Sequence, residues 1–203
     1  MEQMDDDLRP GLARDLDGTF EALLRAHEGR LFTIALRLLG DPRDAEEVAQ
    51  DAFVRAYRAI ASYDAPRIRE LRLRPWLAAI VVNLARNRAT RRRQPPSVSL
   101  DHAAPDGSAV ADRLTTSAPT VDPAIAAERR ESAARWAALL TGLPDRYRTP
   151  IVLRHVDGLS FAEMADALGR PEGTLKAQVH RGLAMLRTAH EAGLRAERQE
   201  MTA

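Results

Sequence analysis

The 203-residue sequence contains no cysteine, few aromatic residues and no long apolar run, and each absence excludes a class of protein. Without cysteine there is no disulfide framework, thiolate metal site or cysteine nucleophile. No apolar segment approaches the roughly 20 residues that a membrane-spanning helix needs. The first seven residues are too acidic for a secretory signal peptide. We therefore expect a soluble, cytoplasmic protein.

The motifs of nucleotide-binding and hydrolytic enzymes are also absent. The sequence has no Gly-x-x-x-x-Gly-Lys loop, no Gly-x-Gly-x-x-Gly fingerprint and no Gly-x-Ser-x-Gly elbow. Its five histidines are scattered, and neither His-Glu-x-x-His nor Glu-x-x-His occurs. We predict that the protein is not an enzyme and has no catalytic residues, no metal site and no cofactor.

Charge is distributed unevenly along a chain whose net charge is only +1. Residues 61–93 carry nine arginines against two acidic side chains, whereas residues 1–60 and 94–127 are acidic. A short basic segment inside a nearly neutral chain indicates one surface that binds a polyanion, rather than nonspecific binding by the whole protein.

Apolar residues in the first half recur at helical spacing from Thr19 onwards. We expect three helices within 19–93: one that ends at Gly40, one that begins at Asp41-Pro42, and one that Pro75 opens. A basic connection, 62–74, precedes the third helix. Residues 1–18 are acidic with little periodicity and are predicted to be a mobile tail.

The second half begins with a change of composition. Residues 94–122 contain four prolines, lack periodicity and are too long for a loop inside one compact domain, so they are predicted to be a flexible linker. Residues 123–190 again have helical patterns, including a capping box at Ser160, and 191–203 form a tail. The sequence therefore predicts an all-α protein with two small helical domains joined by a flexible linker.

The last two helices of the second domain, joined by a three-residue turn, have the dimensions of a helix-turn-helix. A helical wheel places polar side chains on the outer face of the second helix, where they could read the major groove. Helix pairs of this kind also occur in proteins that bind no DNA. The candidate DNA-reading residues are Thr174, Lys176, Gln178, His180 and Arg181.

The third helix of the first domain has a polar arc beside an aromatic residue, which suits contact with single-stranded DNA. The alternative is a solvated face whose asparagines bond to neighbouring backbone. The terminal run 91–93 is most simply a phosphate anchor, although basic helix ends also complement the helix dipole. The candidate residues are Trp76, Asn83, Arg86, Asn87, Thr90 and Arg91.

A charged face on the second helix of the first domain has no metal-ligand geometry. We interpret it as a surface that faces solvent or a partner protein. Its residues are Asp44, Glu46, Glu47, Gln50 and Asp51.

Two blocks of sequence resemble a known family. Segments 36–53 and 75–87 resemble region 2 of the extracytoplasmic-function (ECF, group 4) sigma-70 factors of bacterial RNA polymerase. Segments 143–144, 158–176 and 180–187 resemble region 4 of the same family. The resemblance covers roughly 19–93 and 128–188, with the two blocks in the family's order.

This resemblance implies a role in transcription initiation, with promoter DNA and core RNA polymerase as partners. The charged helix face would bind the clamp helices of the polymerase β′ subunit, and the second domain would contact the β flap. The arc at Asn83 and Asn87 would bind and help open the −10 element, and the face at Lys176 and Arg181 would read the −35 element. An anti-sigma factor is a further expected partner.

The sequence departs from the family pattern at three places. The segment 64–74 is more basic than the usual connection, and Ala177 replaces a polar residue. Pro150 lies inside a family helix, where we expect it to remove one backbone hydrogen bond and disturb the helix. Two other functions remain open on the residues alone: a stand-alone helix-turn-helix regulator that binds DNA as a dimer, and a pure protein-interaction module.

Overall fold

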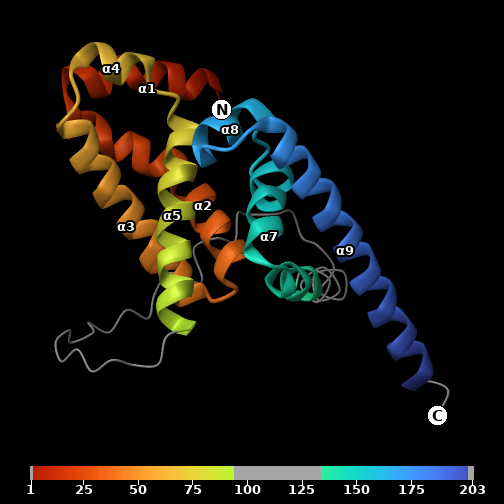
Figure 1. The fold of residues 1–203 in the computed structure, drawn as a ribbon. Coiled ribbons are helices and arrows are strands. Elements are labelled where there is room, and N and C mark those ends of the chain that lie inside the picture. Colours follow the sequence, from red (N-terminus) through yellow and green to blue (C-terminus); the bar gives the residue numbers. More distant parts are fainter. Residues whose placement is uncertain (1, 94–133, 201–203) are drawn as a thin grey trace, which may run out of the picture.

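The computed structural model describes residues 2–93 and 134–200 (Figure 1). The segment expected to be a linker, 94–122, and the start of the second domain lie outside these residues. The described chain contains helices and no strand, so the all-α prediction is confirmed. The first domain consists of α1 (Glu2–Arg14), α2 (Leu16–Leu39), α3 (Pro42–Ala61), α4 (Ala65–Glu70) and α5 (Leu73–Arg93).

The turn between α2 and α3 forms as the sequence predicts. Gly40 ends α2 with φ at +74°, a left-handed conformation that glycine adopts without strain. The Asp41 carboxylate then accepts hydrogen bonds from the backbone N–H groups of Arg43 and Asp44, at 2.9 and 3.1 Å. The bond from Asp44 is the main cause that lowers the pKa of Asp41, so the cap is ionised at neutral pH.

The expectation of a mobile N-terminal tail is wrong for residues 2–14, which form α1. This helix packs on α2 and α4 through the buried side chains of Leu8 and Leu12. The Asp5 carboxylate also lies 3.0 Å from Nε2 of the fully buried His27 on α2. Two leucines four residues apart are too few to give a periodic signal, and Pro10 within the segment weakens it further.

The basic connection 62–74 also contains a helix that the sequence reading did not resolve. Asp64 caps α4 by accepting a hydrogen bond from the Arg67 N–H at 3.1 Å, and Ile68 is buried beneath it. α5 begins at Leu73, two residues before Pro75. A proline in the first helical turn costs no backbone hydrogen bond, since those N–H groups have no intrahelical partner.

The second domain is described from residue 134. Residues 134–142 are helical and precede the helix-turn-helix and its supporting helix. The remaining elements are α7 (Asp145–Ile151), a π-helical turn (Val152–Val156), α8 (Phe161–Leu168) and α9 (Glu172–Glu200).

Two local predictions for this domain can be compared with the structure. The Ser160 capping box forms: its hydroxyl accepts from the Glu163 N–H at 3.2 Å, and the Glu163 carboxylate accepts from the Ser160 N–H at 2.8 Å. Pro150 was expected to disturb its helix, and the helix changes to π-type hydrogen bonding at Val152, where the Asp157 N–H donates to the Val152 carbonyl at 3.0 Å.

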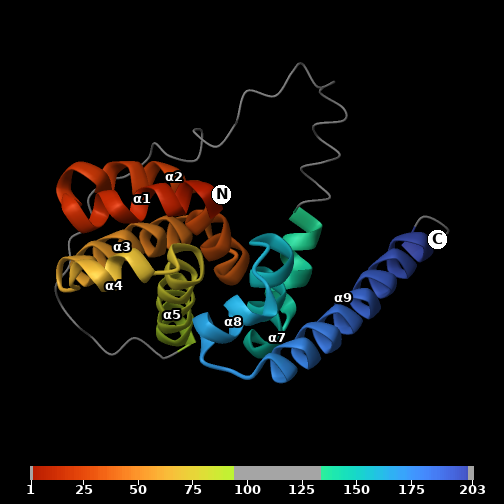
Figure 2. The same ribbon diagram turned by 90° about the horizontal axis from the view of Figure 1, so that it is seen from above.

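The two domains pack directly against each other, which the sequence reading did not anticipate. α5 lies beside α8 in both ribbon views, and α2 contacts both α7 and the π-helical turn (Figures 1 and 2). Buried residues of both domains, including Val82 of the first and Leu153 and Met164 of the second, form one continuous apolar cluster. The position of one domain relative to the other is therefore set by shared packing.

A close approach between α7 and α9 depends on Gly182. A Cβ atom at this position would lie 2.5 Å from Cδ1 of Ile151 and 3.1 Å from Cβ of Tyr147, whereas a Cβ at Gly193 would meet nothing within 4 Å. The absence of a side chain at 182 is therefore what allows the two helices to touch.

We predict that Gly182→Ala lowers the free energy of unfolding by about 1–2 kcal/mol, because overpacking outweighs the gain in helix propensity. Gly193→Ala is the matched control and should raise it by up to about 1 kcal/mol. Urea denaturation followed by circular dichroism measures both values. Equal stabilisation by the two substitutions would show that the α7–α9 contact is loose.

Candidate nucleic-acid interface

α5 is buried along two stripes and exposed along a third. At about 100° per residue, Leu77, Val81 and Leu84 form one stripe with Arg88, which reaches α3. Ala78, Val82 and Ala85 form the other, and Val82 and Ala85 share a small cavity with residues of α7. The remaining arc, about 140° wide by the same geometry, points to solvent.

That exposed arc carries five of the six residues predicted to contact the −10 element: Asn83, Arg86, Asn87, Thr90 and Arg91. Among the described residues, neither Arg86 nor Arg91 has an ion-pair partner, so both are free to meet phosphate. The Thr90 hydroxyl instead donates to the Arg86 carbonyl at 2.9 Å. It is thereby held against its own helix.

Trp76, the sixth residue, is half-buried at the start of α5. Its ring lies 6.3 Å from that of Tyr63, centroid to centroid, and the Arg67 guanidinium stands 3.8 Å above the Tyr63 ring. An aromatic pair capped by an arginine therefore adjoins the polar arc. The sequence reading had singled out Trp76 but neither Tyr63 nor Arg67.

The helix-turn-helix presents its predicted reading face to solvent. Thr174, Lys176, His180 and Arg181 are exposed on α9. The Lys176 Nζ lies 3.2 Å from Glu172 in a weak exposed i,i+4 pair that DNA phosphate can replace. Gln178 differs from the others because it is half-buried and its Oε1 lies 3.5 Å from Arg170.

The charged face of α3 divides into one structural residue and four exposed or half-exposed ones. The Asp44 side chain is only 10% exposed, and its carboxylate pairs with Arg88 at 2.6 Å and Arg92 at 2.8 Å on α5. Burial opposes the charge of Arg88, but Asp44 and Glu47 outweigh it and raise the pKa of Arg88. Asp44 was predicted to bind a partner; in the free chain its carboxylate is already paired with these two arginines.

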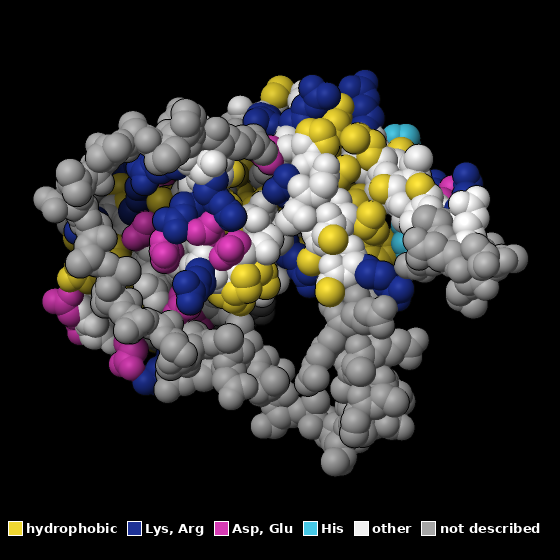
Figure 3. Space-filling model, turned by 90° about the horizontal axis from the view of Figure 1, so that it is seen from below, with side chains coloured by type: hydrophobic (Ala, Val, Ile, Leu, Met, Phe, Trp, Pro, Cys, Tyr) yellow, Lys and Arg dark blue, Asp and Glu magenta, His cyan; other side chains and the backbone are white. Residues whose placement is uncertain are grey.

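Seen from below the view of Figure 1, acidic and basic side chains lie together over the first domain rather than in separate patches (Figure 3). Of the arginines in residues 61–93, Arg72, Arg88 and Arg92 have acidic partners. The local field is therefore smaller than the sequence count of residues 61–93 indicates.

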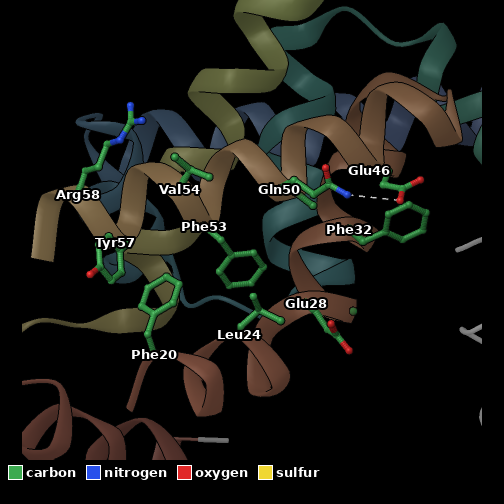
Figure 4. A pocket seen from close by; sticks show the side chains of 12 residues that line it. Phe20, Leu24, Glu28, Phe32, Glu46, Gln50, Phe53, Val54, Tyr57 and Arg58 are labelled. Atoms are coloured by element: carbon green, nitrogen blue, oxygen red, sulfur yellow. Dashed lines mark hydrogen bonds between the residues drawn. The ribbon is translucent and has the colours of Figure 1, made fainter. Parts of the chain in front are cut away.

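An open apolar groove runs between α2 and α3, with a volume of about 670 Å³. Figure 4 shows the side chains of Phe20, Leu24 and Phe53 along it, and a hydrogen bond between Gln50 and Glu46 at its edge. Val54 is 48% exposed on the same surface. The Tyr57 hydroxyl donates to the Asp17 carboxylate at 2.5 Å, which raises the pKa of Tyr57.

Among the described residues, no helix is long and apolar enough to cross a membrane, and no cluster of His, Asp and Glu could hold a metal ion. What the described chain offers is three exposed surfaces on a helical body. They are the arc of α5, the outer face of α9 and the groove with its adjoining face on α3.

Comparison with known proteins identifies the family to which these surfaces belong. Residues 23–94 match the family Sigma-70 region 2, and residues 134–186 match Sigma-70, region 4. Over 168 residues the chain is 30% identical to the ECF RNA polymerase sigma factor SigW of Bacillus subtilis, which covers 83% of this chain and 87% of that protein. The chain belongs to the ECF sigma-70 family.

This sigma factor is also similar to SigM of Mycobacterium tuberculosis, with 32% identity over 169 residues, 82% of this chain and 74% of that protein. Two solved structures share its fold. CnrH in complex with the cytosolic domain of CnrY gives a TM-score of 0.66 at 24% identity, over 93% of this chain and 98% of that one. RpoE in complex with the anti-sigma factor NepR, from Bartonella quintana, gives a TM-score of 0.60 at 20% sequence identity. That match covers 85% of this chain and 96% of the other.

The Asp44 cluster predicts different effects for two acidic residues that share the partner Arg88. Asp44→Asn should lower the free energy of unfolding by about 2–3 kcal/mol, because two arginines lose a nearly buried counter-charge. The Glu47 side chain is 57% exposed and lies 2.6 Å from Arg88. Glu47→Gln should therefore lower the free energy of unfolding by less than about 1 kcal/mol. Chemical denaturation of both variants measures the difference, and similar losses would contradict a structural role for Asp44.

Proposed function

We propose that this sigma factor directs core RNA polymerase to promoters through α9 and α5 and holds the polymerase through the surface formed by α2 and α3. The observation that carries the proposal is the exposure of both polar reading faces. α5 is buried along its other two sides, and α9 is anchored by the buried stripe of Leu175, Val179 and Leu186, so each face is presented on a packed helix.

For the −35 element, α9 would enter the major groove with its first three turns. Lys176 and Arg181 can bond to guanine edges or phosphate, and the small Ala177 and Ala184 allow a close approach. His180 lies on the same exposed face. Gln178 would first have to leave its contact with Arg170 to reach a base.

For the −10 element, the arc of α5 would contact the separating strands. Asn83 and Asn87 lie one turn apart on that arc and carry both donors and acceptors, as a displaced base requires. Arg86 and Arg91 flank them and would hold the strand by its phosphates. Trp76 at the start of the arc offers a stacking surface.

For the polymerase, the groove and the neighbouring side chains of α3 form one surface with an apolar centre and a polar rim. An amphipathic helix fits such a groove, and the β′ clamp helices are the expected occupant. Glu46, Glu47, Gln50 and Asp51 form the rim. On the second domain, the exposed Trp136 and Leu183 suit contact with the β flap.

The chain would act without catalytic activity of its own, in the cytoplasm where the polymerase works. An anti-sigma factor is an expected further partner. A stand-alone regulator is not favoured, because it would leave the α5 arc and the groove without a role.

Run-off transcription tests the proposal. Core polymerase with this sigma factor should initiate at cognate promoters selected from a library, whereas core polymerase alone should not. Specific duplex binding by the chain without polymerase, together with no initiation, would instead favour the stand-alone regulator.

Two substitutions separate the reading roles. Arg181→Ala should reduce discrimination at the −35 element by about tenfold, since one good bidentate base contact is worth roughly 1–3 kcal/mol. Asn83→Ala should slow promoter opening more than it weakens the closed complex. Binding and permanganate footprinting on the same promoter measure both steps, and a loss of −35 binding in both variants would overturn the division of labour.

The groove gives a further prediction. Val54→Asp places a charge at the apolar surface and should weaken binding to core polymerase at least tenfold. Because Val54 is half-exposed in the free chain, the substitution should change the free energy of unfolding by less than about 0.5 kcal/mol. Arg55→Gln, one residue along α3 and also exposed, is the control because it shifts the net charge by the same one unit; equal weakening would point to charge alone.

A further inference from the structure

A nearly buried cluster of charges joins the two domains. The Arg30 guanidinium on α2 holds the Asp157 carboxylate through two contacts, Nε to Oδ1 at 2.5 Å and Nη2 to Oδ2 at 2.7 Å. Their side chains are only 9% and 1% exposed. Arg74, where α5 begins, donates from Nη2 to the Asp157 carbonyl at 2.6 Å and accepts from Arg30 through its own carbonyl at 2.9 Å.

Other contacts across the same interface are of different kinds. The buried Arg148 donates to the Leu38 carbonyl at 2.5 Å. Arg72 pairs with Asp166 at 2.8 Å, but there both side chains are more than half exposed. Arg72 also lies 3.7 Å from Glu163. Among the described residues, Arg30–Asp157 is therefore the interdomain ion pair with both side chains nearly buried, and Arg72–Asp166 is its solvated counterpart.

A buried ion pair responds differently to domain separation and to mutation. When the domains part, both charges return to water, and their recovered hydration offsets much of the lost attraction. When one partner is removed from the closed body, the other stays buried without a counter-charge. Such a pair fixes one arrangement of the domains and still allows them to separate.

The closed arrangement cannot place both reading faces on one promoter. The two elements are about 25 base pairs apart, roughly 85 Å along B-DNA at 3.4 Å per pair. A compact chain of 203 residues has a radius of gyration of about 17 Å and is thus roughly 45 Å across. The reading residues of α9 lie in its first three turns, near α8, rather than on the part that projects outward (Figure 2).

We propose that the Arg30–Asp157–Arg74 cluster is an interdomain latch that keeps the free chain closed and unable to span a promoter. The latch opens when polymerase binds the two domains at separate places. This inference rests on the proposed function, because it takes the arc of α5 and the face of α9 as the two DNA readers. Until the latch opens, the free chain binds polymerase with an affinity reduced by the fraction that is open.

The absence of cysteine makes the closed state directly measurable. Arg55 on α3 and Glu191 on α9 are exposed, one in each domain. Replacing both with cysteine allows a fluorescent donor and acceptor to be attached to the full-length chain. We expect Asp157→Asn to lengthen the average distance between the dyes. Arg30→Met removes the partner that the first domain contributes and should also lengthen this distance.

Asp166→Asn is the matched control, because it removes the acidic partner of the solvated Arg72–Asp166 pair at the same interface. This substitution should leave the distance between the dyes unchanged. Circular dichroism is the control for folding, and each variant should remain helical. The two latch variants should also bind core polymerase up to about tenfold more tightly, if the open fraction rises from about a tenth to most of the population.

An unchanged distance in both latch variants would overturn the latch, and so would a longer distance without tighter binding to polymerase. A lengthening as large in Asp166→Asn would also contradict it. Failure of the unsubstituted chain to bind polymerase would contradict the proposed function, whereas the distances report on the cluster independently of that result.

Discussion

The arrangement of this sigma factor depends on one constraint, that α5 is buried along two sides by two different groups of helices. Leu77 and Val81 pack within the first domain, and Val82 and Ala85 lie against the second. Only one arc remains for solvent, and it carries the asparagines and free arginines. The same packing that fixes the domains therefore decides which residues are available to DNA.

Charge is used in two ways around this helix. Arg88 and Arg92 are neutralised by Asp44 and hold α5 against α3, whereas Arg86 and Arg91, on the exposed arc, have no such partner among the described residues. Four arginines within seven positions thus divide into two that stabilise the fold and two that can bind a polyanion. A count of charges along the sequence cannot make this distinction, because it depends on which face each residue occupies.

Local signals in the sequence were sufficient to predict most helices and the exposure of the polar faces of α5 and α9. Caps at Asp41 and Ser160, the glycines that end helices and the three-to-four spacing of apolar residues are all encoded within a few positions. α1 escaped because its stability comes from burying Leu8 and Leu12 against other helices, which no short window records. The domain interface was not predicted for the same reason: Val82 and Ala85 are ordinary apolar positions of a helix until residues of α7 lie beside them.

The latch residues have a consequence for how the chain is made. Arg30 and Asp157 are 127 positions apart, and ribosomes add about 5–20 residues per second. Arg30 is therefore synthesised roughly 6–25 s before its ionic partner, and α5, which ends at Arg93, is complete roughly 3–13 s before Asp157 is added. During that interval the second domain does not yet cover α5. The apolar side of α5 at Val82 and Ala85, which is buried in the finished protein, is exposed on the nascent first domain.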